Sequence, residues 1–370
     1  MGAVKIYANA VLKSDLMSSL PIALDAMGGD HAPAAMVEGA VLAAREGIAV
    51  TLVGREADLK RELERFSDSS SLKIAIVHAS DVIGMDDHAT VARKNKNLSI
   101  NVAMNLLRQK TVSAVVAQGH TGATLVSALF GLGRLPGVER PAILSNFPNK
   151  TGRITLVDVG ANADNRAEFL QGFALMGSAY VSAMQGNDSP SVGLLSIGEE
   201  EGKGNALTLE TYDLLKVTPG IRFHGNVEGR DIFTGTVDIV VTDGFTGNIV
   251  LKAAEAEAKV MIGWIKEALT GGNLLTKIGA ALVRPALKSV ADKLDPNEFG
   301  AQPLLGVKGL VFIGHGSSNA RAVYSALKFA ARAVNAGLLE KVALRLEVMT
   351  KKLETAQQLD AAAQTSVETP

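Results

Sequence analysis

Short apolar runs alternate with helical patterns along most of this 370-residue chain, and this alternation strongly limits the folds it can adopt. Each apolar run has the length of a buried strand, and each helical pattern can return the chain to a parallel neighbour. The predicted strands are 21–24, 48–53, 74–77, 112–117, 142–144, 154–157, 192–197, 237–241 and 310–313. The predicted helices include 34–45, 100–108, 124–132, 167–184, 207–215 and 248–269. We therefore predict an α/β fold with a mostly parallel sheet and helices on both faces.

The amino-acid composition supports this fold class and excludes several kinds of site. The chain has 37 glycines and only 4% aromatic residues, which suits a parallel sheet better than a β-sandwich. The net charge of −1 gives no indication of a nucleic acid partner. The absence of cysteine excludes disulfides, cysteine-bound zinc and a thiol nucleophile. His and carboxylate residues show no metal-ligand spacing, so we predict neither a metal nor a cofactor.

The chain is expected to form one main domain with two less ordered ends. Residues 20–350 contain no fixed-period repeat and no long linker rich in Pro, Gly or Ser, so we interpret them as one two-lobed unit. Residues 1–19 are predicted to be a loosely ordered extension, because Lys13 and Asp15 interrupt the apolar core that a signal peptide needs. The polar segment 351–370 is predicted to be a flexible tail. No apolar run is long enough to cross a membrane.

The loops that follow the predicted strands share glycine with Asn, Asp, Ser, Thr or His. They are 26–32, 118–123, 160–164, 198–205, 243–248 and 314–319. Ligands bind at the carboxyl ends of the strands in an open parallel sheet, and NH groups at helix starts can hold an anion. We therefore predict that these loops line one binding cleft. The alternative is ordinary turn chemistry, and no GxGxxG at a strand end, Walker lysine motif, GxSxG or HExxH is present.

Two stretches in the second half of the chain, 199–205 and 226–231, carry cations. Lys203 stands between two glycines, where it could meet an anion or lie in an ordinary surface turn. Arg230 stands beside Glu228 and Asp231, where it could contact a ligand or belong to a structural ion-pair loop.

Residues 261–294 differ from the rest of the chain. Apolar residues recur at helical spacing on both sides of Gly271–Gly272, and basic residues such as Lys277 and Arg284 lie among them. This pattern predicts a helical hairpin with an apolar tip and basic flanks. The hairpin could be buried core, a dimer interface or a reversible membrane contact. The predicted membrane-contacting residues are Leu269, Leu274, Leu275 and Ile278.

The motifs between Ile22 and about Val334 resemble those of the bacterial phosphate acyltransferases of phospholipid synthesis, the PlsX family. The matching stretches are IALDAMGGDHAP (22–33), HTGA (120–123), ERPAI (139–143), LVDVGANAD (156–164), FALMGS (173–178), VGLLSIGEEEGKGN (192–205), GNVEGRDI (225–232), VTDGFTGNIVLK (241–252), PLLGVKG (303–309) and HGSS (315–318). The chain departs from the family pattern at His120, where Asn or Ser is usual. It also departs at Arg166–Ala167, where Lys-Pro is frequent, and at Asn95, which dilutes a basic cluster.

This resemblance implies a fold, a reaction and partners. The fold would be an α/β/α sandwich similar to that of isocitrate dehydrogenase. The reaction would form acyl phosphate from acyl-acyl carrier protein and inorganic phosphate, the first step toward phosphatidic acid. The protein would be a cytoplasmic homodimer peripherally associated with the inner membrane. It would pass its product to a membrane glycerol-phosphate acyltransferase.

The implied reaction needs no nucleophile from the enzyme, because phosphate itself attacks the thioester. The protein must position phosphate and stabilise the oxyanion. The predicted catalytic residues are Lys203, Asn162, Asp243 and His315, and His315 or His120 could carry a proton to the leaving thiol. The predicted substrate- and phosphate-binding residues are Asp25, Gly28, Gly29, Asp30, Gly119, His120, Thr121, Gly122, Asp164, Asn205, Asn248, Ser317 and Ser318.

Three other functions compete with this prediction. A soluble phosphotransacetylase-like enzyme that uses short acyl-coenzyme A would have no need of an apolar, basic hairpin tip. An isocitrate-dehydrogenase-like oxidoreductase would need clustered metal-binding acids and a nucleotide loop, and the sequence has neither. The third alternative is a non-catalytic protein that binds anions.

Overall fold

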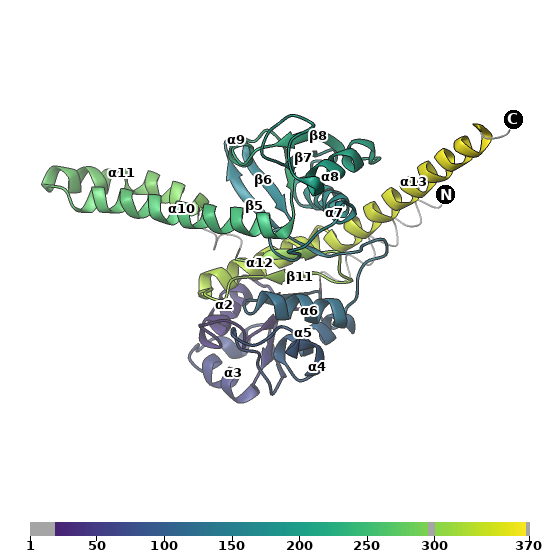
Figure 1. The fold of residues 1–370 in the computed structure, drawn as a ribbon. Coiled ribbons are helices and arrows are strands. Elements are labelled where there is room, and N and C mark those ends of the chain that lie inside the picture. The colour runs from purple at the N-terminus through teal and green to yellow at the C-terminus, as the bar shows by residue number, and fades with distance from the viewer. Residues whose placement is uncertain (1–18, 295–299, 368–370) are drawn as a thin grey trace.

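Eleven strands of the described chain form one sheet, with helices packed on both of its faces (Figure 1). The computed structural model describes residues 19–294 and 300–367, so nearly all of the predicted extension 1–19 lies outside the described residues. The strands are β1 (Ile22–Asp25), β2 (Val50–Gly54), β3 (Ile74–His78), β4 (Ala114–Ala117), β5 (Ala142–Asn149), β6 (Gly152–Val157), β7 (Ser191–Leu195), β8 (Arg222–Val227), β9 (Ile239–Val241), β10 (Gln302–Leu305) and β11 (Val311–Ile313). Their order in the sheet is β3-β2-β1-β4-β11-β10-β5-β6-β9-β7-β8.

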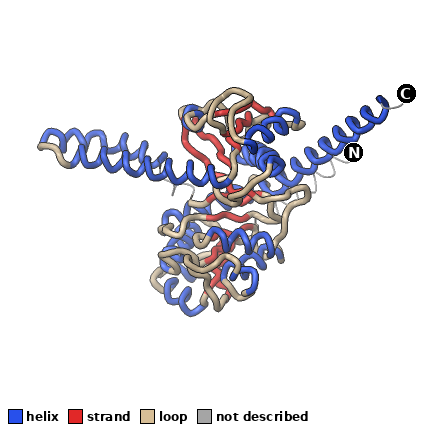
Figure 2. Tube along the Cα trace, in the orientation of Figure 1, coloured by secondary structure: helices blue, strands red, loops and turns tan. Residues whose placement is uncertain are grey.

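The sheet consists of two parallel blocks that run in opposite directions. In the first block, β3, β2, β1, β4 and β11 are parallel, and in the second, β6, β9, β7 and β8 are parallel. Between the blocks, β10 pairs antiparallel with β11 and β5, and β5 pairs antiparallel with β6. Each block belongs to one lobe of the molecule, as the separated groups of strands in Figure 2 show. The mostly parallel sheet predicted from the sequence is confirmed.

Sequence reasoning missed two strands, β8 and β10. In β8 the apolar alternation is interrupted by His224 and Gly225, so its pattern is weak. In β10 the short sequence contains Pro303, which argues against a strand because proline cannot donate to the ladder. Pairing with neighbouring strands overrides both local signals.

The helices form the two outer layers predicted from the alternating pattern. They are α2 (Ala34–Arg45), α3 (Glu56–Leu63), α4 (Val91–Lys94), α5 (Ser99–Arg108), α6 (Thr121–Gly131), α7 (Ala167–Gln185), α8 (Ala206–Val217), α9 (Asp231–Thr234), α10 (Gly244–Thr270), α11 (Leu274–Leu294), α12 (Ala320–Asn335) and α13 (Leu338–Val367), with a short 3₁₀ turn at Ser69–Ser71. One core contains apolar residues of α2, α7, α12 and α13 with those of the sheet. A second core contains residues of α5, α6, α9 and α10, so both faces of the sheet are covered.

Two long helical features project from the body. Helices α10 and α11 form an arm, which confirms the predicted helical hairpin, although α10 begins earlier than the predicted helix, at Gly244 (Figure 1). Helix α13 extends in another direction and continues to Val367. The segment 351–370, predicted to be a flexible tail, is therefore helical in its described part.

Candidate active site

Three of the predicted loops meet at the carboxyl ends of the first parallel block. The Asp30 NH donates a hydrogen bond to the Gly316 carbonyl (2.8 Å), which joins loop 26–32 to loop 314–319. Gly29 has a φ of +95°, and a Cβ there would lie 2.5 Å from the Gln118 carbonyl. Gly28 and Gly119 also pack backbone to backbone. Glycine is needed at these positions because the loops approach closely enough to exclude a side chain.

The polar side chains under these loops are buried and have protein partners. Asp25 accepts a hydrogen bond from the Met27 NH (3.2 Å), and burial raises the pKa of its carboxyl group. Gln118 accepts a hydrogen bond from the Ser318 hydroxyl (2.8 Å) and donates to the Gly300 carbonyl (3.2 Å). Asp25 and Ser318 therefore help to hold the loops in place through hydrogen bonds within the protein. Direct contact of these two residues with substrate stays a prediction. Sequence reasoning missed Gln118, although a polar residue directly after a buried strand could have indicated it.

His120 caps helix α6. Its Nδ1 accepts a hydrogen bond from the Ala123 NH (3.2 Å), and its Nε2 lies 2.9 Å from the Asp87 carbonyl. Both ring nitrogens are therefore engaged within the protein, in an arrangement that fits the neutral ring with its proton on Nε2. Asn and Ser, which are usual here in the family that the sequence resembles, are also favoured N-cap residues. A role of His120 in proton transfer stays a prediction.

The second group of loops is organised around Asp158, a buried residue that sequence reasoning missed. Its carboxylate accepts hydrogen bonds from the NH groups of Ile143, Ala161 and Asn162, at 3.0, 3.0 and 2.8 Å. Burial raises the pKa of Asp158, and these hydrogen bonds counter that effect. The Asn162 side-chain amide donates to Asp158 Oδ2 (2.9 Å) and to the Pro141 carbonyl (2.8 Å). Asn162 thus holds the turn in place, and its role toward substrate stays a prediction.

Helix α10 starts directly on this turn. The Gly244 NH donates to the Asn162 carbonyl (3.0 Å), and a Cβ on Gly247 would collide with the Asp158 carbonyl. Asp243, predicted to be catalytic, is the N-cap of α10 and accepts a hydrogen bond from the Thr246 NH (2.8 Å). Asn205 likewise caps α8 by accepting from the Thr208 NH (2.9 Å). These two side chains therefore have a structural use as caps.

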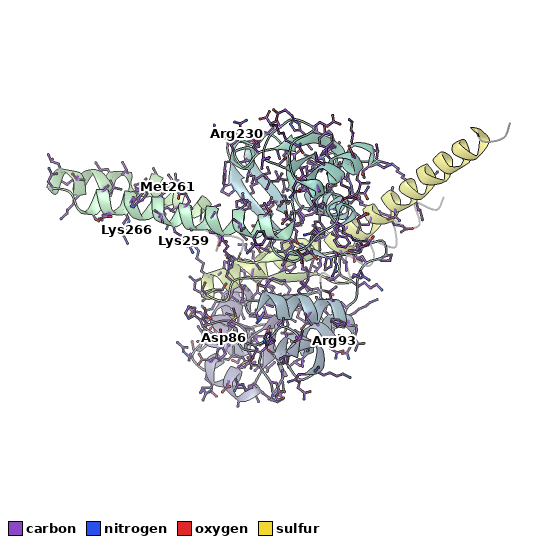
Figure 3. All side chains as sticks on the ribbon, in the orientation of Figure 1. Asp86, Arg93, Arg230, Lys259, Met261 and Lys266 are labelled. Atoms are coloured by element: carbon purple, nitrogen blue, oxygen red, sulfur yellow. The ribbon has the colours of Figure 1, made fainter. Side chains whose placement is uncertain are left out.

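Several predicted site residues remain open to solvent. Those with exposed positions are Asp30, Thr121, Asp164, Lys203, Asn205, Asn248 and Ser317. Among the described residues, Lys203 takes part in no ion pair. Arg230 instead pairs with Glu199 (2.7 Å) and Glu228 (3.4 Å), so it belongs to a structural ion-pair loop. Figure 3 shows Arg230 on the lobe of the second block.

A cluster on α10 connects the two groups of loops. Glu255 Oε1 lies 3.2 Å from His315 Nε2, Glu255 Oε2 lies 3.1 Å from Lys252 Nζ, and Lys252 Nζ lies 3.5 Å from His315 Nδ1. Burial raises the pKa of Glu255, but hydrogen bonds and charge from His315 and Lys252 outweigh it and lower the pKa to about 2. Sequence reasoning missed Lys252 and Glu255. Their spacing from Asn248 places all three on one helical face, and that spacing could have indicated them.

Five of the six predicted loops thus fall into two contacting groups. Loops 26–32, 118–123 and 314–319 touch one another, and loops 160–164 and 243–248 do the same. Loop 198–205 leaves from β7, directly beside β9. Antiparallel strands separate the two blocks, which therefore run in opposite directions. Contact between the two groups of loops therefore depends on α10 and His315. A single cleft lined by all six loops stays a prediction.

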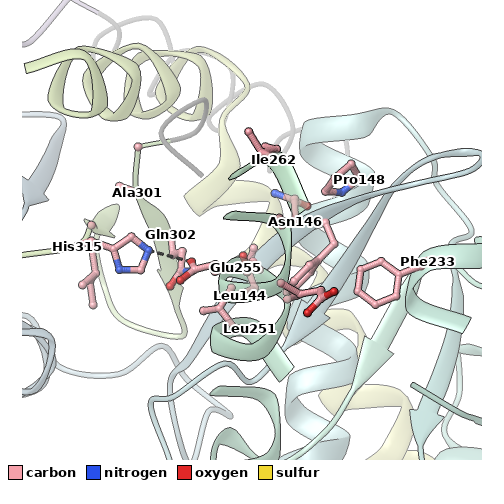
Figure 4. Close-up of a pocket in the computed structure, with 18 of the residues that line it drawn as sticks. Leu144, Asn146, Pro148, Phe233, Leu251, Glu255, Ile262, Ala301, Gln302 and His315 are labelled. Carbon is pink, nitrogen blue, oxygen red and sulfur yellow. Dashed lines mark ion pairs between the residues drawn. The ribbon is translucent and has the colours of Figure 1, made fainter. Parts of the chain in front are cut away.

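An apolar cavity of about 400 Å³ opens beside the His315–Glu255 pair (Figure 4). Strand β5 forms one wall with Leu144 and Phe147, and α10 forms another with Leu251, Ala258 and further residues. The remaining lining residues are Ser145, Asn146, Pro148, Phe233, Ala254, Glu257, Met261, Ile262, Ile265, Val290, Gly300, Ala301, Gln302, Pro303, Ile313 and Gly314. This volume lies in the range of about 300–1,000 Å³ that is typical of small-molecule sites.

Comparisons with known proteins identify the family of this chain. A family model described as "Fatty acid synthesis protein" matches residues 20–341. A protein from Thermus thermophilus named "Phosphate acyltransferase" is 56% identical over 328 residues, covering 89% of this chain and 99% of the relative. A protein of the same name from Deinococcus radiodurans is 50% identical over 290 residues, covering 78% of this chain and 80% of the relative.

Solved structures confirm the predicted fold class. A phosphotransacetylase from Streptococcus pyogenes superposes with a TM-score of 0.58 at 17% identity, covering 90% of this chain and 99% of that one. A 4-hydroxythreonine-4-phosphate dehydrogenase from Klebsiella pneumoniae gives 0.50 at 12% identity, covering 86% and 99%. At such identities these likenesses show the fold alone. With a family model matched over residues 20–341 and 56% identity to a phosphate acyltransferase, the chain belongs to the fatty acid synthesis protein family of PlsX-type phosphate acyltransferases.

Proposed function

We propose that this protein transfers the acyl group of acyl-acyl carrier protein to inorganic phosphate and so forms acyl phosphate, the first step toward phosphatidic acid. The observation that carries this proposal is the apolar cavity that opens at the His315–Glu255 pair. A long acyl chain has the apolar surface that such a lining binds. The short acyl group of a phosphotransacetylase substrate has little apolar surface to bury in such a lining.

In the proposed mechanism, phosphate binds at the glycine-rich loops and attacks the thioester carbonyl. Backbone NH groups at the start of α6, together with the exposed Lys203, supply positive charge for phosphate and for the developing oxyanion. The bond between phosphate oxygen and carbonyl carbon forms, and the bond between carbon and sulfur breaks. Hydrogen phosphate loses one proton and the leaving thiolate needs one, so a single base can carry it between them.

His315 is placed to carry that proton. Glu255 faces its Nε2 at 3.2 Å and orients the ring, and Lys252 Nζ lies 3.5 Å from its Nδ1, so Nδ1 carries the proton once the ammonium of Lys252 turns to the phosphate. Lys252, 3.5 Å from Nδ1, adds positive charge where the oxyanion or phosphate would lie. Lys252 and Glu255 thus join the residues predicted from the sequence.

The test of this function is a product assay. The purified protein, given acyl-acyl carrier protein and phosphate, is expected to form an acyl phosphate that hydroxylamine traps as a hydroxamate. A product that requires short acyl-coenzyme A instead would support the phosphotransacetylase-like alternative. If neither donor gives a product, the result would support the alternative that the protein binds anions without catalysis.

We also propose that the arm formed by α10 and α11 contributes to a homodimer and touches the cytoplasmic face of the inner membrane reversibly. Leu275 is 77% exposed and Ile278 is 51% exposed at the tip, where Lys277 lies between them, while Leu269 is half-buried. The side chain of Leu274, which was also predicted to contact the membrane, lies outside the described residues. Within the described part of the chain, no helix is both long and apolar enough to cross a bilayer.

Basic residues along the arm would favour an anionic lipid surface. Figure 3 shows Lys259, Met261 and Lys266 along α10, so cations and apolar side chains share this helix. Each cation near such a surface contributes about 1 kcal/mol, and buried apolar area contributes about 25 cal/mol per Å². A contact of this strength suits delivery of acyl phosphate to a membrane glycerol-phosphate acyltransferase, because the contact can be released.

Liposome flotation tests the membrane contact. With vesicles that contain phosphatidylglycerol, the double variant Leu275→Asp, Ile278→Asp is expected to lose most of the wild-type flotation, because it places two charges on the apolar tip. Leu209→Asp is the matched control, since Leu209 is also an exposed leucine, 40% accessible, but lies on α8. If the wild type and the tip variant float equally, the membrane contact is contradicted, and only the proposed role of the arm in the dimer remains.

A further inference from the structure

We propose that the cavity between α10 and β5 holds the acyl chain, with the thioester carbonyl at His315 and the methyl end at Phe233. This inference rests on the proposed function and specifies where the substrate lies. In Figure 4, His315 and Glu255 lie toward one end of the cavity, Phe233 and Pro148 lie at the other, and Leu144 and Leu251 lie between them.

The walls of the cavity suit an apolar ligand. Leu251, Ala254, Ala258 and Ile262 follow one another at spacings of three and four residues, so they lie on one face of α10. The two alanines on this face leave space that larger side chains would fill. Opposite them, the Phe147 side chain from β5 is 6% exposed.

Two polar side chains of the lining, Asn146 and Glu255, already have partners within the protein. Asn146 donates to the Tyr180 hydroxyl (2.8 Å) and accepts from Thr155 (2.9 Å). Glu255 is paired with His315 and Lys252. An apolar chain can therefore enter without leaving these two groups unsatisfied.

The ends of the cavity set the direction of the chain. The paired groups His315 and Glu255, which can move a proton, lie at one end of the described lining, so the thioester belongs there. At the other end, Phe233 from α9 packs edge-on against Phe147, with ring centroids 6.4 Å apart and planes at 89°. We infer that this aromatic pair stops the chain and so limits its length.

Chain-length profiles test this placement. In the hydroxylamine assay, kcat/KM of the wild type is expected to rise about fourfold per added methylene, because each buried methylene contributes about 0.8 kcal/mol. Ala258→Phe fills part of the cavity. It is expected to lower the ratio of kcat/KM for palmitoyl-acyl carrier protein to kcat/KM for hexanoyl-acyl carrier protein by about tenfold or more, because about two methylenes of the long chain would no longer be buried. Ala256→Phe places the same side chain at an exposed position of α10 outside the lining and is expected to keep the wild-type ratio.

Phe233→Ala provides a second variant, and it is expected to move the optimum toward longer chains. An acyl carrier protein substrate with a terminal diazirine locates the chain directly, since photolysis is expected to label peptides that contain Phe147, Phe233 or 251–265. The inference is overturned if the label falls elsewhere or if Ala258→Phe keeps the wild-type ratio. It is also overturned if Ala258→Phe, unlike Ala256→Phe, separates a dimer, since a second copy would then fill the cavity. A wild type that forms no acyl phosphate would instead contradict the proposed function.

Discussion

Replacing Lys203 by alanine is expected to lower kcat/KM for acyl phosphate formation by about 100-fold to 1,000-fold, the usual effect of removing one preorganised electrostatic donor. The backbone around Lys203 is held in place, because its carbonyl accepts from the Ser196 hydroxyl (3.1 Å) and Asn226 donates to the Glu200 carbonyl (2.8 Å). The side chain itself is exposed and takes part in no ion pair of the described residues. A fixed loop with a free cation is suited to binding phosphate.

The stability of Lys203→Ala is expected to change by less than about 0.5 kcal/mol, as for most exposed substitutions. Lys216→Ala is the matched control, because Lys216 is also exposed but pairs with Glu201 at 2.7 Å. Steady-state kinetics and urea unfolding of both variants distinguish the roles. Equal activity in the two variants, or early unfolding of Lys203→Ala with full activity in the folded fraction, would assign Lys203 to the structure and not to catalysis.

Replacing Glu255 by glutamine is expected to remove a stabilisation that depends on pH. The pKa of Glu255 is lowered from 4.5 to about 2 in the folded protein, which corresponds to at most about 3 kcal/mol in favour of the folded state. Because the folded-state pKa is the lower one, this stabilisation is complete above about pH 5 and is lost as the pH falls toward 2. Roughly half of it should remain at pH 3.

Urea unfolding of the wild type and Glu255→Gln at several pH values measures this difference. Other carboxylates titrate in both proteins, so the gap between the two free energies of unfolding isolates Glu255. The gap is expected to be largest near neutral pH and to close by about pH 2. A gap that does not depend on pH would mean that the ion pair of Glu255 with His315 and Lys252 adds no net stability.

Local sequence patterns predicted much of the fold. Helix α2 matches its predicted bounds, 34–45, and the hairpin at Gly271–Gly272 was identified from the apolar residues on either side. Strands β8 and β10 were missed because their own residues are poor strand formers, and only pairing with neighbours makes them strands. The antiparallel centre of the sheet was missed for the same reason, since strand direction is not encoded in a single strand.

Some features of the candidate site could likewise be predicted from the sequence, and others required the structure. The glycine-rich loops and the motifs shared with a family of acyltransferases were readable in the chain, because a turn with positive φ requires glycine wherever it occurs. The sequence did not show whether a polar side chain in such a loop hydrogen-bonds within the protein or stays free to bind a ligand. His120, Asp243 and Asn205 are helix caps, whereas Lys203 stays exposed.

By itself, the sequence determined the fold class, the glycine-rich loops at the strand ends and the family, since these depend on local spacing and residue type. Only the tertiary structure decided that Glu255 and Lys252 meet His315, 60 and 63 residues further along the chain, and that an apolar cavity opens beside them. Such contacts depend on how α10 crosses between two oppositely directed blocks of the sheet. The path of α10 between the two blocks is set by packing between elements distant in sequence, so it cannot be predicted from a local sequence pattern.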